Sequence, residues 1–254
     1  MMDFKLYLVA LVVVAVSLVA PTADAQTSSG EWQFAVAPYL WAAGMDGTMT
    51  VGEMEQDIDV PFSDVLDDLD FALMGHFDMR NDRWMVSSDL VFVDLGTSED
   101  VDPIEPGDPI NVKTGLDMTL FELAGGYRVT PVFTLLVGGR WVDMTAEISV
   151  LDGLQGHHAE ASKSWLDPLV GVHAFVPLSQ RWWLGLRGDV GGFGVGSELS
   201  WQAYADIGWQ VSDLVAIILG YHALDIDYEG GTGIQTAELD LMLSGPQLGV
   251  AFRF

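Results

Sequence analysis

Residues 201–210 read WQAYADIGWQ, and this stretch decides the fold class. Successive side chains of a β-strand point to opposite faces of a sheet. The two faces here are Trp201, Ala203, Ala205, Ile207 and Trp209 against Gln202, Tyr204, Asp206 and Gly208. An apolar face opposite a polar or small one is typical of a membrane β-barrel, whose strands face lipid outside and a polar lumen inside.

The same alternation recurs along the chain. The predicted strands cover residues 32–42, 71–80, 84–95, 114–127, 133–147, 165–176, 182–193, 198–210, 214–227 and 241–254. Their lengths are near the roughly 9 to 11 residues that a tilted strand needs to cross a bilayer. We therefore predict an all-β protein, a transmembrane antiparallel up-and-down β-barrel of ten strands. Because residues 215–219 are apolar on both faces, eight or twelve strands remain alternatives, as does a soluble lipocalin-like barrel.

The connections between these segments also alternate in length. Those after the second, fourth, sixth and eighth segments are tight, whereas most of the others are long. Outer-membrane barrels have short periplasmic turns and longer external loops. Both chain termini are thus predicted to lie in the periplasm.

The first 25 residues are predicted to be a secretory signal peptide. A short apolar run over 6–20 precedes the small-residue pair of Ala23-Asp24-Ala25, which matches an A-x-A cleavage site. We expect two regions, a signal peptide over 1–25 and a single outer-membrane β-barrel domain over 26–254. The predicted localisation is the bacterial outer membrane.

The chain is strongly acidic, with a formal net charge of −27. Without residues 1–25 it has 37 − 2 = 35 acids and 10 − 1 = 9 bases, a charge of −26. This charge argues against nucleic acid as a partner. Because there are no cysteines, disulfides and thiolate metal sites are excluded. We expect no cofactor, and the expected partners of a monomer are the lipid bilayer, lipopolysaccharide and the barrel assembly machinery.

The C-terminal residues QLGVAFRF alternate and end on an aromatic ring. Leu248, Val250, Phe252 and Phe254 lie on one face of this segment. The pattern resembles the terminal signal that outer-membrane barrels present to their assembly machinery. Aromatic residues are also expected at both membrane interfaces, with Trp41, Trp165, Phe193, Trp201 and Tyr228 toward the outer one.

Charged side chains of both signs are predicted to face the lumen. They are His76, Asp78, Arg80, Asp89, Glu122, Arg140, Asp167, His173, Arg187, Asp189 and Asp206. Buried charges need partners, and a lumen near eight strands is just wide enough for side chains to fill it. We expect a charge-paired core that fills the lumen; the alternative is a gated polar path.

The first external loop is predicted to contain a short helix. Phe62, Val65, Leu66 and Leu69 follow helical spacing, and Ser63 is a candidate N-cap. Three aspartates lie on the opposite face, which disfavours a helix lying on the lipid surface. Such a helix is a candidate lid over the barrel mouth; the alternative is simple loop packing.

Two pairs of external carboxylates are candidate cation ligands. Asp57 with Asp59, and Asp225 with Asp227, have the oxygen chemistry that divalent cations prefer, but neither pair has the pattern of an EF-hand loop. We expect a solvated acidic rim, with divalent cations as the alternative and no assigned metal site. Catalysis is not expected. An enzymatic site would use His157, His158 and nearby acids and serines in the third external loop, whose spacing fixes no catalytic geometry.

Several longer stretches resemble one family. FSDVLDDLDFALMGHF (62–77), WLDPLVGVH (165–173), LRGDVGGFGVGSELSWQ (186–202), YHALDIDYE (221–229) and LSGPQLGVAFRF (243–254) are similar to a group of largely uncharacterised proteobacterial outer-membrane β-barrel proteins. The resemblance implies the barrel fold and brings no substrate or catalytic residues. The predicted function is that of a structural, envelope or surface-interaction barrel with a largely filled lumen. The alternatives are a narrow passive channel for small polar or cationic solutes and, remotely, an outer-leaflet surface enzyme.

Overall fold

The computed structural model describes residues 31–51, 54–101, 110–152, 155–230 and 237–254. The predicted signal peptide lies outside these residues. Along the described chain, no helix is long and apolar enough to cross a membrane.

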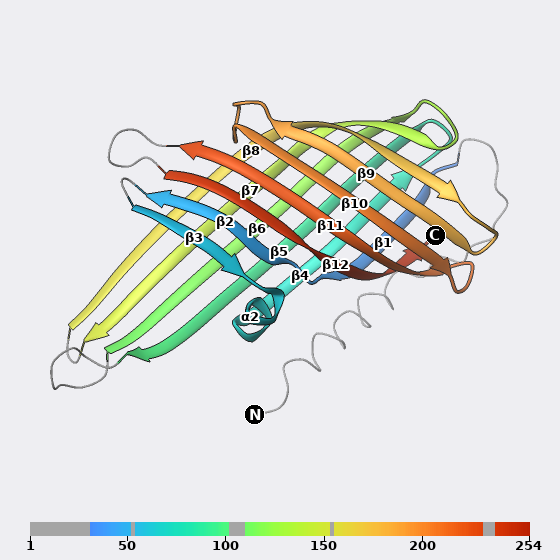
Figure 1. Ribbon diagram of the computed structural model, residues 1–254. Helices are drawn as coiled ribbons and strands as arrows, with labels where there is room; N and C mark the ends of the chain where they lie inside the picture. The colour runs from blue at the N-terminus through green and yellow to red at the C-terminus, as the bar shows by residue number, and fades with distance from the viewer. Residues whose placement is uncertain (1–30, 52–53, 102–109, 153–154, 231–236) are drawn as a thin grey trace.

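Ten antiparallel strands form a closed barrel (Figure 1). Its strands are β1 (Gln33–Trp41), β4 (Leu69–Arg80), β5 (Trp84–Val101), β6 (Ile110–Arg128), β7 (Phe133–Asp152), β8 (Gln155–Pro177), β9 (Trp182–Gly192), β10 (Leu199–Gln210), β11 (Val215–Gly230) and β12 (Ala237–Arg253). Each strand pairs with the next in this order, and β1 pairs with β12 to close the ring. The predicted ten-stranded up-and-down barrel is confirmed.

The two ends of the barrel differ. At the end that we call the inner end, tight turns join the strands and the first described residues meet the C-terminus, as Phe34 and Phe254 exchange two backbone hydrogen bonds of 3.0 Å. At the opposite, outer end the strands β5 to β8 run on well past their neighbours (Figure 1).

The turns of the inner end are built by side chains. The Asn81 side chain accepts hydrogen bonds from the backbone N–H groups of Arg83 and Trp84, at 2.9 and 2.7 Å. The Thr130 and Ser179 hydroxyls accept the corresponding pairs in the next two turns. Short polar side chains thus fix each reversal and the register of the strands that follow.

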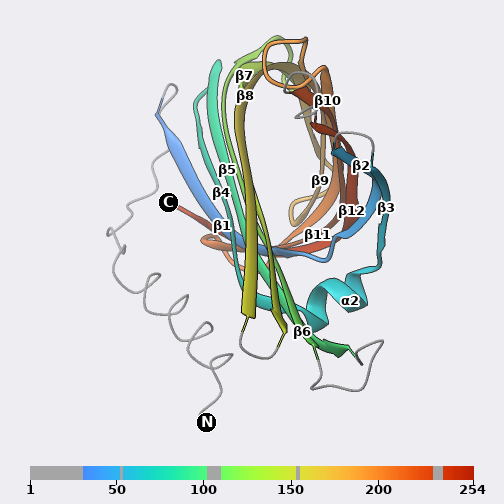
Figure 2. The same ribbon diagram turned by 90° about the vertical axis from the view of Figure 1, so that its left-hand side faces the viewer.

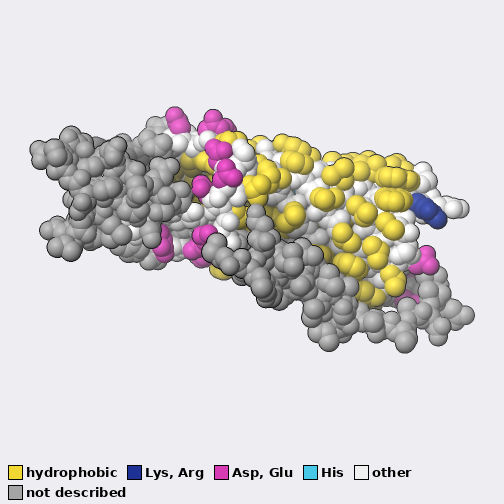
Figure 3. All heavy atoms as spheres, turned by 90° about the horizontal axis from the view of Figure 1, so that it is seen from below, with side chains coloured by type: hydrophobic (Ala, Val, Ile, Leu, Met, Phe, Trp, Pro, Cys, Tyr) yellow, Lys and Arg dark blue, Asp and Glu magenta, His cyan; other side chains and the backbone are white. Residues whose placement is uncertain are grey.

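Apolar side chains cover the outside of the inner part of the barrel. Figure 3 shows them spread over one face, with acidic side chains gathered beyond them toward the outer end. Aromatic rings pack at the inner border, where the rings of Trp84 and Tyr127 lie 5.1 Å apart and those of Trp182 and Trp209 lie 5.9 Å apart. This apolar band, with its aromatic border, is the surface expected to face lipid.

The first strand leaves the barrel wall at its outer end. After Ala42 and Ala43 the chain continues as β2 (Gly44–Val51), which stays paired with β12 and turns back as β3 (Met54–Val60). The helix α2 (Phe62–Asp67) then leads into β4. Figure 2 shows the strands curving around a common lumen, with α2 below β3.

The outer segments differ from the sequence prediction in detail. The predicted loops after the third and fifth strands are largely strand, because β5 with β6 and β7 with β8 continue their pairing outward as hairpins. The short helix is confirmed, but Leu69 begins β4 and does not belong to α2. The predicted Ser63 cap is wrong, since Pro61 takes the N-cap position and the Ser63 hydroxyl bonds Asp64.

Placing a charge in the middle of the apolar band tests the membrane orientation. Val137 on β7 is 65% exposed, and Val137→Arg should destabilise the barrel by about 2 to 4 kcal/mol in lipid vesicles. The control is Val195→Arg in the outer turn between β9 and β10, where the cost should be about 0 to 1 kcal/mol. Urea titration of folding in vesicles measures both, and equal costs would contradict the assignment.

Candidate functional site

The lumen is layered along its axis. All the charged residues predicted for it project inward: His76, Asp78, Arg80, Asp89, Glu122, Arg140, Asp167, His173, Arg187, Asp189 and Asp206. From the inner to the outer end we distinguish an inner cavity, a central network and an outer chamber. The structure brings four of the predicted charges together in the middle layer and distributes the others around it.

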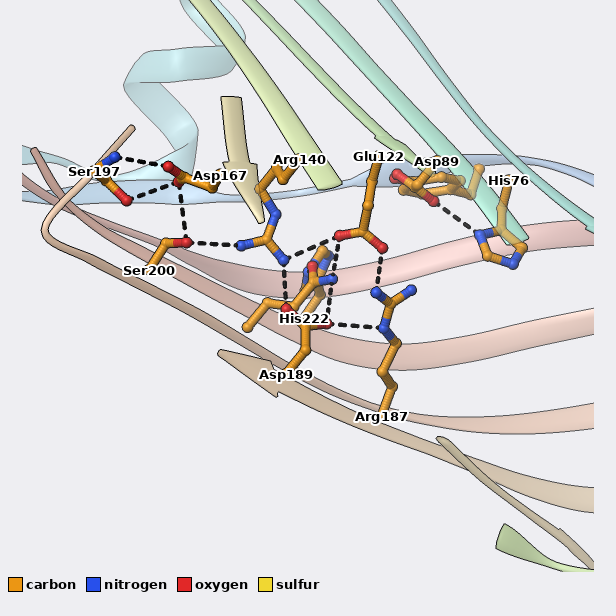
Figure 4. Close-up of polar contacts among 12 residues, drawn as sticks. His76, Asp89, Glu122, Arg140, Asp167, Arg187, Asp189, Ser197, Ser200 and His222 are labelled. Carbon is orange, nitrogen blue, oxygen red and sulfur yellow. Dashed lines mark hydrogen bonds and ion pairs between the residues drawn. The ribbon is translucent and has the colours of Figure 1, made fainter. Parts of the chain in front are cut away.

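The central network consists of Glu122, Arg140, Arg187, Asp189, Gln202 and His222 (Figure 4). The Arg140 guanidinium donates to Glu122 at 3.0 Å and to Asp189 at 2.6 Å. Arg187 donates to the same two carboxylates, through Nε to Asp189 at 2.9 Å and through Nη2 to Glu122. Two positive and two negative side chains thus alternate in a closed ring, and all four are buried.

Gln202 and His222 complete the network, although neither was among the predicted site residues. Gln202 Nε2 donates to Glu122 and to Asp189, both at 2.8 Å, and its Oε1 lies 3.0 Å from His222 Nε2. Both residues face inward by strand alternation. That inward placement is the sequence signal that could have identified them, because a neutral polar side chain in a charged lumen is also expected to form hydrogen bonds.

A second polar cluster lies beside the outer turn. Asp167 accepts hydrogen bonds from the backbone N–H and the hydroxyl of Ser197, both at 2.7 Å, and from the Ser200 hydroxyl at 3.2 Å. Ser200 also accepts from Arg140 at 3.3 Å. The short turn between β9 and β10, in which Gly192 and Gly194 adopt positive φ, is therefore held to the central network.

The inner cavity is polar and has a volume of about 110 Å³. His76 lies between Asp78 and Asp89, with nitrogen to oxygen distances of 3.2 and 3.0 Å. The Tyr39 hydroxyl donates to Asp89 at 2.7 Å, and Gln247 donates to Asp206 at 2.5 Å. The predicted lumen residues on the inner side of the central network thus line a polar space and do not fill it.

The outer chamber is apolar. Its wall is a cluster of inward side chains from most strands: Trp41, Val91, Val93, Leu95, Met118, Leu120, Val142, Trp165, Leu224, Ile226, Leu241 and Leu243. Val65 of α2 packs against this cluster. A cavity of about 60 Å³ remains between α2 and the wall.

Two aromatic residues of this chamber correct the sequence prediction. Trp41 and Trp165 were expected at the outer membrane interface, but they are 5% and 8% exposed and face the lumen. Tyr228, expected there too, stacks on Trp165 at 4.2 Å between ring centroids. Trp165 and Asp167 are two residues apart on one strand and therefore share a face.

The four candidate cation ligands lie on the outside of the outer sheet and do not converge. Asp57 and Asp59 are on β3, whereas Asp225 and Asp227 are on β11, with β2 and β12 between them. Within the described ranges, no three His, Cys, Asp or Glu residues are placed to hold a metal ion. Desolvation, followed by the nearby carboxylates of Asp240 and Asp227, raises the pKa of Asp225. Repulsion from Asp240 and Asp227 thus adds to the effect of burial at Asp225.

The remaining predicted sites are placed but not tested. Leu248, Val250, Phe252 and Phe254 alternate with the inward Gly249 and Ala251 along the closing edge of β12, as an assembly signal would require. The residues His157 and His158 lie in β8, and their side chains are outside the described part of the structure.

Known proteins resemble this chain in fold. No protein family model and no curated protein sequence matches it. Among solved structures it is similar to the outer membrane protease OmpT of Escherichia coli, with a TM-score of 0.54 and 7% identity over 91% of this chain and 99% of that one. The translocator domain of the autotransporter NalP of Neisseria meningitidis gives a TM-score of 0.43 and 11% identity, over 97% and 96%. Ail of Yersinia pestis gives 0.37 and 12%, over 89% and 100%.

Of these three, OmpT is near enough to support the fold, and at 7% identity it shows the fold alone. The closed barrel, a fold shared with OmpT, and its apolar outer band agree with the predicted localisation in the bacterial outer membrane. The finer resemblance to a proteobacterial group stays a prediction.

Removing one charge from the central network should be costly. Arg140 is 2% exposed and bonds Glu122, Asp189 and Ser200. Arg140→Ala leaves buried carboxylates without their cation, and we expect a loss of about 3 to 5 kcal/mol in the free energy of unfolding. Arg181→Ala in an exposed inner turn is the matched control, with an expected change within about 0.5 kcal/mol. A similar loss for both variants in denaturant titrations would show that the network does not support the fold.

Proposed function

We propose that this chain is a non-conducting outer-membrane barrel that acts through its outer end, as a surface-interaction or envelope protein. One observation carries the proposal. The hydrogen-bonded chain from Glu122 on β6 through Gln202 to His222 on β11 joins strands that are half the ring apart. Such a chain crosses the lumen, and a solute would have to break it.

The energetics of the network support a permanent seal. Arg140, Arg187, Glu122 and Asp189 are each at most 6% exposed and share four ion pairs. Separating such a pair leaves an uncompensated buried charge, which is strongly unfavourable. The ring therefore closes the lumen as a fixed part of the structure.

The other end of the lumen opposes ion flow as well. A cation that entered from outside would first cross the apolar outer chamber, where the described residues that line the cavity beneath α2 are all apolar. Moving an ion into such surroundings is costly without partners. Both layers thus favour a sealed barrel.

The outer end is where partners would bind. Its surface carries carboxylates on neighbouring strands, including Asp46, Asp59, Asp227 and Asp240, all exposed. Such carboxylates can bind divalent cations, which in turn bridge to anionic lipopolysaccharide. We therefore propose lipopolysaccharide as the neighbour of a monomeric barrel. Assembly would use the C-terminal signal of β12 through the barrel assembly machinery.

A narrow passive channel is the second candidate. The polar inner cavity, with Asp78, Asp89 and Asp206 on its wall, is the observation that favours it, because acids at a pore favour cations. This candidate requires the central network to open. A surface enzyme has no supporting arrangement among the described side chains, and the proposal does not include catalysis.

Planar bilayer recordings test the seal. The unmodified barrel should show no steady openings at any applied potential. The charge-balanced variant Glu122→Ala, Arg140→Ala, Arg187→Ala, Asp189→Ala removes two acids and two bases, and should show steady openings because the lumen loses the side chains that fill it.

Two outcomes would decide against the proposal. Steady, cation-selective openings of the unmodified barrel that change when residues 62–69 are removed would establish the gated channel. Silence of the charge-balanced variant, in a form whose gel mobility still changes on heating, would contradict the part of the proposal that assigns the seal to the central network.

A further inference from the structure

We propose that the outer chamber is a binding site for one acyl chain of a membrane lipid, which enters sideways past α2. The inference goes beyond the sealed barrel and does not depend on it. It rests on three features of the outer end: an apolar cavity, a split in the barrel wall, and a weakly held helix across the split.

The cavity has room for a hydrocarbon and none of the partners that water needs. It measures about 60 Å³, which exceeds the 10 to 15 Å³ or so that one water requires, but a buried water also needs two to four polar partners. The residues that line it are all apolar, among them Ala43, Ala72, Met74, Met118 and Leu243. An apolar occupant is therefore favoured over water.

The wall is split beside this cavity. β1 and β4 pair only as far as Pro38 and Gly75, so the described part of β4 before Gly75 has β5 as its one strand partner. The first strand continues instead as β2, which pairs with β12 and β3. Between β3 and β4 the wall is thus formed by α2, and this gap is the lateral entrance.

The helix α2 is suited to move. It has six residues, none of them buried, and no side-chain hydrogen bond caps its N-terminus. So short a helix has little stability of its own. It meets the chamber through Val65, which packs on the wall, and through the partly exposed Phe62 and Leu66, which also line the cavity. Displacing α2 therefore breaks few interactions and enlarges the cavity.

The entrance faces lipid. Phe62 and Leu66 of α2 are 38% and 50% exposed, and the neighbouring Leu73 of β4 is 46% exposed on the outside of the barrel. Leu73 alternates with Ala72 and Met74, which line the cavity. Lipid and chamber are therefore separated at this point by β4 and α2 alone. An acyl chain can reach the cavity from the membrane without crossing water.

The charge around the entrance restricts the head group. Asp64, Asp67 and Asp68 lie on or next to α2 and carry no neighbouring base within this helix. Where no divalent cation bridges these carboxylates to it, an anionic head group would be repelled at this position. The site therefore fits a lipid with a zwitterionic head group that stays at the split while one chain enters.

Photolabelling in the membrane tests the site. The full chain is folded into vesicles of phosphatidylcholine, a fraction of which carries a diazirine in the middle of one acyl chain, and labelled residues are mapped by mass spectrometry. We expect labels at the inward Met74, Met118 and Leu243 in addition to outward residues such as Leu73. Labels confined to outward residues would overturn the proposal.

A filled chamber provides the matched comparison. Ala72→Trp places a ring in the cavity and should lower inward labelling roughly tenfold or more, because the ring excludes several methylene groups of the acyl chain from the cavity. Leu73→Trp, one residue away and facing lipid, should leave it unchanged. Equal inward labelling in the two variants would refute the site.

Folding and sealing are measured separately. Heat-dependent gel mobility verifies that each variant is folded, and Ala43→Trp fills the same cavity from the opposite side if Ala72→Trp does not fold. The labelling map of the unmodified protein decides the question even when neither variant folds. Bilayer recordings of the same samples report the seal, so failure of one proposal is distinguishable from failure of the other.

Discussion

The structure depends on closing the backbone hydrogen bonds of the sheet. In hydrocarbon an unpaired N–H or C=O group costs several kcal/mol, so a membrane sheet cannot keep a free edge. Here the pairing of β1 with β12 removes both edges within the apolar band. Once ten strands form the ring, the diameter follows, and a lumen of this size brings side chains from opposite walls into contact. The charged ring of the central network is a consequence of that diameter.

The constraint ends where the lipid ends, and the wall changes there in two ways. The outward and inward faces of the wall exchange polarity. Within the apolar band β11 presents Leu219 outward and His222 inward, whereas beyond the band it presents Asp225 outward and Ile226 inward. The ring also opens on one side of β4, since β1 continues as β2 at the border of the apolar band, where lipid head groups and water can satisfy the free backbone groups while Leu73 still faces lipid. An apolar chamber with a lateral gap is thus compatible with the outer end and would not be tolerated in mid-membrane.

Local patterns in the sequence predicted the parts of the fold that local physics determines. Alternation such as that of residues 201–210 gave the strands and their inward faces, and the tight connection after the second predicted strand is the turn that Asn81 stabilises. The split at Ala42 and Ala43 was not predicted, because it depends on which neighbour β12 pairs with at each height, a relation between distant segments. Trp165 was misplaced for a different reason. A preference of tryptophan for interfaces was given more weight than the strand geometry that ties it to Asp167, and strand geometry is the stronger constraint.

Trp41 and His222 join the chamber to the seal. Trp41 forms part of the chamber wall, stacks on His222 at 4.2 Å between ring centroids, and donates from its indole nitrogen to the His222 carbonyl oxygen at 3.2 Å. His222 is also the last member of the bonded chain that crosses the lumen. The apolar outer chamber and the central network are therefore in direct contact. An occupant of the chamber would rest against a ring whose position is fixed by buried charges, which makes the chamber a blind site. Whatever enters past α2 cannot continue through the central network to the inner cavity.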